Sequence, residues 1–353
     1  MWILSNMTPF AAASSWVRDE KGAEVWIVAV RGSFRIEANG KQVPDEHQTE
    51  VTYFPEFRGN PDSSSLICEC DLEHKKHSTD VLVDGYAFAP GGRPATCVDV
   101  RLKLANIDKT LRIYGDRVIK GSLMGVTPGK AKPFQKMPII YERSFGGTDL
   151  QDQDPKRHAW VPENPVGVGF ANEKKRILET LAPNIEAPNS PYNHFKRGKP
   201  VGFGPIARHW MPRVKLAGTY DKECEETRNP LLPSDFDERF YQCAPRDQQI
   251  NGFLKGGERV ELYNMTADSF LTFQLPRVRL RLRTYFYDGT IANHQALLHT
   301  LILQPHQRRF QMVWHSHLPC HQKVNKLQQT KIGFKTWLQV PKEELESGVW
   351  IGG

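Results

Sequence analysis

The sequence contains no apolar run long enough to cross a bilayer, which takes about 20 consecutive apolar residues. It also shows no leader peptide, because residues 1–6 carry no basic group and only a short apolar stretch. We therefore expect neither a helical membrane protein nor a cleaved secretory signal. We expect instead a soluble protein of the cytoplasm with no membrane partner.

Cysteine is scarce and irregularly placed. The spacing lacks the dense regularity of a secreted disulfide framework, so we expect free thiols. The six cysteines are Cys68, Cys70, Cys97, Cys224, Cys243 and Cys320.

Familiar catalytic and nucleotide-binding motifs are missing as well. There is no Gly-x-Ser-x-Gly elbow, no Walker lysine and no His-Glu-x-x-His helix. The formal charge of +7 favours acidic partners in general, but no nucleic-acid-binding module accompanies it. We expect no enzymatic activity, no catalytic residue, no cofactor and no nucleic-acid partner.

The amino-acid composition is typical of a globular protein. Hydrophobic residues make up 39% and charged residues 25%, enough for a substantial core in 353 residues. We treat residues 1–353 as a single unit. The pattern of residues divides it into an N-terminal β region (1–127), an irregular segment (128–250) and a C-terminal β region (251–353).

Strand patterns dominate the two outer regions. Residues 25–30 form a continuous apolar run, and residues 79–88 alternate between apolar and polar. Alternation also predicts two hairpins and two further strands. The ranges are 97–104 with 110–119 around a loop at 106–109, 297–303 with 309–315 around 304–307, and single strands at 259–263 and 271–275.

The middle region holds most of the 25 prolines, which interrupt sheet ladders because proline lacks an amide donor. Its aromatic residues nevertheless favour packing onto a scaffold. Residues 173–181 predict its one convincing helix. The fold class is therefore mainly β: an antiparallel sandwich-like scaffold, as one sandwich or two, with a long Pro/Gly-rich irregular segment and one or two short helices.

Four arginines alternate with aliphatic residues at 277–283, so a strand there would present guanidinium groups on one face. Such a face can bind an acidic protein or nucleic acid, or it can simply be solvated at a sheet edge. The residues are Arg277, Arg279, Arg281 and Arg283.

Two groups of histidine and cysteine raise the question of a metal site. Neither matches the paired spacing typical of structural zinc, so we expect no metal. The groups are His315, His317, Cys320 and His321, and Cys68, Cys70, His74 and His77.

Carboxylates leave an enzymatic alternative open, a β-rich hydrolase that acts on a glycan through an acid–base pair. Aspartates in such loops more often cap turns. The candidates are Glu142, Asp221, Asp235 and Asp237.

A set of short motifs runs through the chain in a fixed order. It includes Thr79-Asp-Val-Leu-Val-Asp-Gly-Tyr-Ala, Tyr141-Glu-Arg-Ser-Phe-Gly-Gly, Asn164-Pro-Val-Gly-Val-Gly-Phe, Gly202-Phe-Gly-Pro-Ile, Ala217-Gly-Thr-Tyr-Asp, Leu232-Pro-Ser-Asp-Phe-Asp and Leu254-Lys-Gly-Gly-Glu. In these motifs the sequence resembles the family catalogued as domain of unknown function 2169, over essentially the whole chain.

The resemblance implies a bacterial adaptor or chaperone that loads effectors with PAAR-type domains onto the VgrG spike of the type VI secretion system. It implies an effector partner and leaves open a contact with VgrG and the oligomeric state. Aromatic and arginine side chains are typical interface anchors, although they also pack loops onto a core. Besides the four alternating arginines, the candidates for partner binding are Arg143, Phe145, Trp160, Phe203, Arg208, Trp210 and Arg213.

Overall fold

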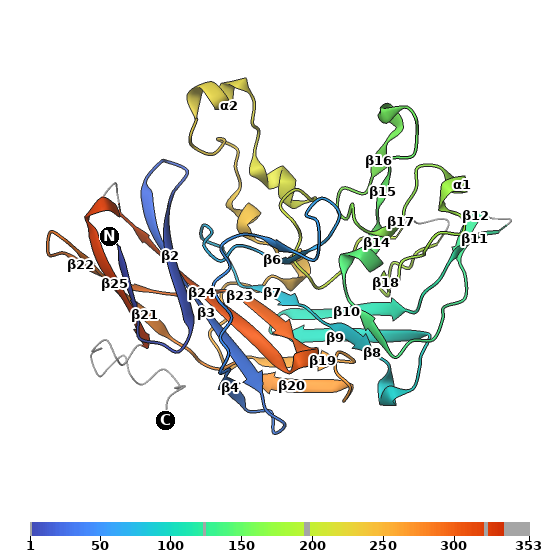
Figure 1. Cartoon of the computed structure of the whole chain (residues 1–353), viewed down its shortest axis with the longest axis horizontal. Helices are drawn as coiled ribbons and strands as arrows, with labels where there is room; N and C mark the ends of the chain where they lie inside the picture. The colour runs from blue at the N-terminus through green and yellow to red at the C-terminus, as the bar shows by residue number, and fades with distance from the viewer. Residues whose placement is uncertain (1, 123–124, 194–197, 321–323, 335–353) are drawn as a thin grey trace.

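The computed structural model describes residues 2–122, 125–193, 198–320 and 324–334, and it is mainly β (Figure 1). No helix in these residues is long and apolar enough to cross a membrane. The mainly β class expected from the sequence is confirmed.

A central six-stranded sheet joins the two ends of the sequence. Strands from the first 83 residues pair with strands from residues 297–319, so the N-terminal and C-terminal β regions form one body. The sheet runs in the order β2 (Ala11–Arg18), β3 (Glu24–Ile36), β24 (Arg309–Pro319), β23 (Leu297–Gln304) and β7 (Asp80–Val83), with β4 (Gln42–Pro44) paired to β3.

Strand β3 is buried along most of its length. Every residue from Val25 to Phe34 is buried, which explains the continuous apolar run of the sequence, since a strand covered on both faces needs no polar alternation. One face carries Trp26, Val28 and Phe34 into the main hydrophobic core, whereas Arg31 and its neighbours face a polar layer on the other side.

Two further sheets cover the core face of the central sheet. The five-stranded one meets it through a stack in which Phe310 lies 5.1 Å from Phe34 and 5.0 Å from Phe273, between ring centroids. At the other end, the Trp26 indole donates to the Thr330 hydroxyl of the four-stranded sheet. The five-stranded order is β18 (Ile185–Glu186), β10 (Ile107–Tyr114), β9 (Cys97–Leu104), β19 (Arg259–Tyr263) and β20 (Phe270–Gln274); the four-stranded order is β1 (Ile3–Asn6), β25 (Leu327–Phe334), β21 (Leu280–Phe286) and β22 (Ile291–Gln295).

Residues of all three sheets belong to one hydrophobic cluster. The central sheet therefore packs against both of the other sheets, so the fold is neither a single two-sheet sandwich nor two separate sandwiches.

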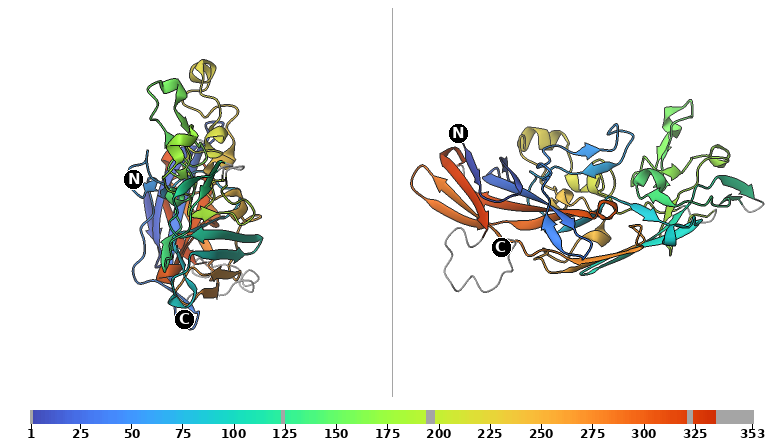
Figure 2. Two further views of the ribbon diagram at one scale, coloured as in Figure 1. Left: turned by 90° about the vertical axis from the view of Figure 1, so that its right-hand side faces the viewer. Right: turned by 60° about the horizontal axis from the view of Figure 1, so that its bottom comes forward.

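The later part of the irregular segment lies over the opposite face of the central sheet, where Arg213 binds Glu69, whereas its earlier part lies beside the five-stranded sheet, with a bridge between Ser144 and Ile185 (Figure 2). It contains short strand pairs and single helical turns rather than extended elements. Its strands, besides β18, are β13 (Lys136–Pro138), β14 (Phe145–Gly146), β15 (Thr148–Asp149), β16 (Ala159–Trp160) and β17 (Val168–Gly169). The pair β11 (Ile119–Ser122) and β12 (Gly125–Pro128) leads into it, and β5 (Glu56–Phe57), β6 (Leu66–Cys68) and β8 (Tyr86–Phe88) come earlier in the chain.

The described helices are all short. The α-helices are α1 (Lys174–Ile177) and α2 (Lys222–Thr227), in agreement with the one or two expected. The 3₁₀ turns are η1 (Pro90–Gly92), η2 (Tyr141–Arg143), η3 (Pro155–Arg157), η4 (Arg213–Ala217), η5 (Glu238–Tyr241), η6 (Arg246–Gln248), η7 (Pro305–Gln307) and η8 (Val324–Lys326).

The helix expected over residues 173–181 is wrong in extent, because α1 ends at Ile177. Glu179 adopts a positive φ of 59°, and its amide donates to the carbonyl of Ile119, whose own amide donates to Thr180. Backbone pairing with a distant segment therefore replaces the later turns of the helix. Leu181, expected on its apolar face, is exposed.

The hairpin predictions fare better. β23 and β24 pair around η7 as expected. β9 and β10 also pair, but the turn is only Ala105 and Asn106, because Leu104 already pairs with Ile107. The sequence located both hairpins and placed one loop a few residues too late.

Replacing Phe310 by alanine should remove the ring that joins the central and five-stranded sheets. We expect the free energy of unfolding to fall by about 3–5 kcal/mol, the usual cost of truncating a fully buried aromatic residue. Phe270→Ala is the matched control, since its ring is 41% exposed, and it should cost about 1 kcal/mol. Urea denaturation measures both variants, and equal losses would contradict this account of the core.

Candidate functional site

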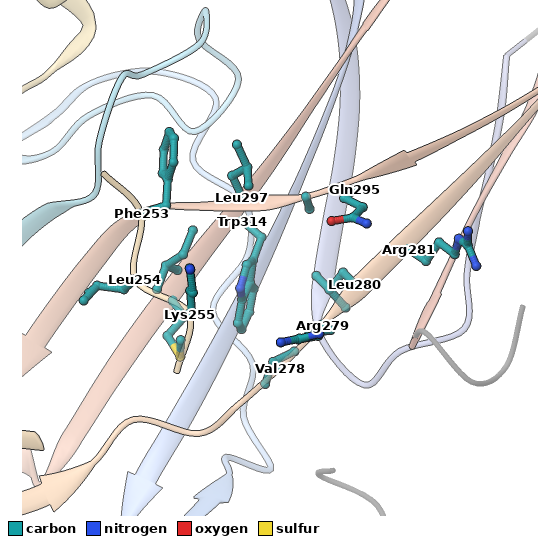
Figure 3. A pocket seen from close by; sticks show the side chains of 13 residues that line it. Phe253, Leu254, Lys255, Val278, Arg279, Leu280, Arg281, Gln295, Leu297 and Trp314 are labelled. Carbon is teal, nitrogen blue, oxygen red and sulfur yellow. The ribbon is translucent and has the colours of Figure 1, made fainter. Parts of the chain in front are cut away.

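A pocket opens where the three large sheets diverge (Figure 3). Its volume of about 420 Å³ lies within the range of sites that hold small ligands or anchoring side chains. Three segments distant in sequence meet here: residues 253–255 before β19, residues 278–281 entering β21, and residues 295–298 between β22 and β23. Met312 and Trp314 of β24 complete the wall.

The floor of the pocket is apolar. Trp314 stands at its centre in Figure 3, with Leu254 and Leu280 around it, and all three side chains are at least 95% buried. Leu297 is exposed at the mouth. Such a floor favours burial of an apolar group from a partner, worth about 25 cal/mol per Å² removed from water.

The rim of the pocket is cationic and follows from the arginine pattern. Val278, Leu280 and Leu282 are buried, as the alternation predicted. Arg279 is exposed at the rim, and Arg281 is half-buried beside it. Of the other two arginines, Arg277 is exposed and precedes β21, and Arg283 donates from Nε to the Asn293 side chain, 3.0 Å away.

A glycine turn brings one more cation to this rim. Gly256 has a φ of 87°, and a Cβ there would lie 2.5 Å from the carbonyl oxygen of Pro276, so only glycine fits. The preceding residue, Lys255, is exposed and lines the same pocket as Arg279. The rim therefore joins positive charges from two segments that are far apart in sequence.

The pocket's described lining contains no group suited to acid–base or nucleophilic catalysis. Apart from Gln295, its polar side chains are those of Lys255, Arg279 and Arg281. The pocket therefore combines an apolar floor with a cationic rim.

The other candidate residues lie elsewhere. Trp160 is 56% exposed on β16, at the end of the molecule remote from β21 (Figure 1). Phe145, Phe203 and Trp210 are at least 95% buried, so in this conformation they pack the interior, the role that the sequence had left as the alternative. Arg143 is half-buried, and its guanidinium lies 2.9 Å from Asp116.

Arg208 and Arg213 belong to the polar layer on the outer face of the central sheet. Both bind the buried Glu69, with N–O distances of 2.9 Å to Arg208 and 2.7 Å to Arg213. Arg208 also contacts Glu73. These two arginines therefore anchor the irregular segment internally.

The four candidate carboxylates are each held by hydrogen bonds from neighbouring groups. Hydrogen bonds from Thr219 lower the pKa of Asp235, and those from Arg239 lower the pKa of Asp237, whereas a glycosidase acid needs a raised pKa. All four accept hydrogen bonds from neighbours: Glu142 from Ser65, Asp221 from Cys224, Asp235 from Thr219, and Asp237 from Arg239.

The histidines that are neighbours in the sequence have other neighbours in the structure. His74 stacks on Tyr241 and His77 pairs with Glu238. His74 lines one small cavity with Cys68 and Cys70, but within the described part of the chain these residues do not form a metal-ligating group. The Cys320 thiol donates to the carbonyl of Leu318, and His321 lies outside the described residues.

His315 and His317 instead meet His299. The spacing argument missed His299, although the predicted pairing of residues 297–303 with 309–315 placed it on the strand beside them.

Replacing Glu69 by glutamine should leave the buried Arg213 without its counter-charge. We expect a loss of about 3–5 kcal/mol in the free energy of unfolding at pH 7, as for other broken buried ion pairs. Glu73→Gln is the matched control, because Glu73 pairs only with the more exposed Arg208, and it should cost about 1 kcal/mol or less.

The ion pairs of Glu69 also predict how the stability of the protein depends on pH. Burial alone would raise the pKa of Glu69, but Arg213 and Arg208 outweigh burial and hold it below the ordinary value of 4.5. A lowered folded-state pKa stabilises the protein fully above pH 4.5, and this stabilisation is lost as the pH falls through the folded-state pKa. Denaturation at several acidic pH values should show the gap between wild type and Glu69→Gln narrowing below pH 4.5, and a gap that widens there would contradict the pairing.

Comparison with known proteins supplies the family. Residues 21–315 match the model of DUF2169, described as an uncharacterized protein conserved in bacteria. No curated protein and no solved structure matches the chain. The family match covers most of the sequence, and every residue that lines the pocket lies within it. The chain therefore belongs to the DUF2169 family.

Proposed function

We propose that this protein is a non-enzymatic adaptor that binds an effector of the bacterial type VI secretion system through the pocket between its sheets. In this proposal it acts in the cytoplasm, where it holds an effector with a PAAR-type domain for loading onto the VgrG spike. The observation that carries the binding role is the pocket itself, an apolar floor with a rim of Lys255, Arg279 and Arg281.

The chemistry of the pocket specifies the kind of segment that would occupy it. An apolar side chain inserted against Trp314 removes hydrophobic surface from water, and acidic residues beside it pair with the rim arginines. We therefore expect an apolar anchor flanked by aspartate or glutamate on the effector. The link to secretion rests on what the sequence resemblance to this family implies.

Affinity purification from the native bacterium at moderate salt tests the adaptor role. Mass spectrometry should find a PAAR-containing effector or VgrG enriched over a tag-only control. A preparation with neither protein would reject the proposal.

Charge reversal at the rim tests the pocket. The double variant Arg279→Glu/Arg281→Glu should weaken effector binding by at least about tenfold, because acidic side chains then face like charge. Arg93→Glu/Lys130→Glu makes the same change in net charge at two exposed positions outside the pocket and should leave affinity nearly unchanged. Titration of each variant with the purified effector measures both. Equal weakening in the two double variants would show that net charge, and not the pocket, governs binding.

A further inference from the structure

Three histidines from two paired strands meet on the outer face of the central sheet. His315 and His317 lie two residues apart on β24, and His299 comes from β23 beside it. The register shifts between Leu298 and Thr300, so His299 is the extra residue of a β-bulge. Bulges redirect side chains, and this one stacks His299 on His315, with ring centroids 4.7 Å apart.

The three imidazoles are close enough to share a ligand. One nitrogen from each ring lies within 4.8 Å of the others. A tetrahedral ion with nitrogen ligands at about 2.0–2.1 Å needs these nitrogens about 3.4 Å apart, so the rings would close by at most roughly 1.4 Å.

The imidazole nitrogens have unused bonding capacity. The Nε2 atoms of His299, His315 and His317 are buried, and none has a hydrogen-bond partner within the described part of the chain. The side chains of His299 and His315 are only 3% and 2% exposed. The Nδ1 atoms of His315 and His317 lie 3.5 Å apart, within hydrogen-bond distance. Buried polar groups normally have partners, so an unpaired nitrogen on each of three clustered rings points to a missing partner.

The surroundings leave room for one small ion. A cavity of about 20 Å³ is lined by His299 and His315, though not by His317, and is large enough for about one water molecule. Asp71 and Glu73 also line it, and these carboxylates pair with Arg31 and Arg208. The nearby cation, Lys76, is neutralised by Asp80, 2.6 Å away.

We propose that His299, His315 and His317 bind a divalent transition-metal ion, zinc in the first instance, with water in the fourth position. Imidazole is a preferred ligand of zinc, and three histidines suffice for such a site. The cavity has no room for a substrate beside the ion, so the metal would hold β23 and β24 together rather than support a reaction. This inference is independent of the adaptor role.

The alternative is a ring stack without metal. Phe253 stacks on His299 with ring centroids 5.6 Å apart, so the cluster could serve packing alone. His299→Phe separates the two ideas, because phenylalanine keeps an aromatic ring at this position and removes the ligand nitrogen.

The test uses the full chain, stripped of metal with a chelator and dialysed. Titration with Zn²⁺ should give one ion per chain and raise the melting temperature, and Co²⁺ should give the visible absorption of a tetrahedral complex. His299→Phe should weaken Zn²⁺ binding by at least about 100-fold, more than loss of an outer-shell partner usually costs. His317→Asn should do the same and serves if His299→Phe fails to fold.

His47→Asn is the control, because His47 is exposed and outside the cluster. This variant should bind Zn²⁺ as the wild type does. The proposal is overturned if the wild-type chain binds no Zn²⁺ or Co²⁺, if binding survives in a folded His299→Phe or His317→Asn variant, or if His47→Asn loses it equally.

Discussion

Buried charge on the outer face of the central sheet constrains the rest of this structure. Arg31 on β3 and Asp80 on β7 point away from the hydrophobic core, yet neither side chain reaches solvent. Their partners, Asp71 and Lys76, come from the irregular chain that precedes β7. An unpaired charge in such a place costs several kcal/mol, so this chain must lie over the sheet for the sheet to be stable.

Glu69 adds further ion pairs to this layer of buried charge. This carboxylate follows β6 and binds Arg208 and Arg213 from the irregular segment, which ties that segment to the chain already fixed on the sheet. Buried ion pairs and hydrogen bonds therefore order a region whose prolines prevent it from forming long strands or helices. The same layer explains why arginines that resemble interface anchors serve internal packing.

The two faces of β24 divide the candidate sites between them. Successive residues of a strand point to opposite faces, so Trp314 enters the pocket on the core side and His315 enters the histidine cluster on the polar side. Phe253 connects the two, since it lines the pocket and stacks on His299. The binding pocket and the histidine cluster thus share one hairpin, β23 with β24, as their support.

The sequence by itself determined the mainly β class, the family, both hairpins and the alternation that turns Arg279 and Arg281 away from Leu280, because strand periodicity is a local property. Tertiary structure decided the rest. Backbone pairing with Ile119 ends α1 early. Phe203 and Trp210 are buried in the interior, and a β-bulge places His299 beside His315. Each of these outcomes depends on which segments, distant in sequence, become neighbours, and local periodicity carries no information about that choice.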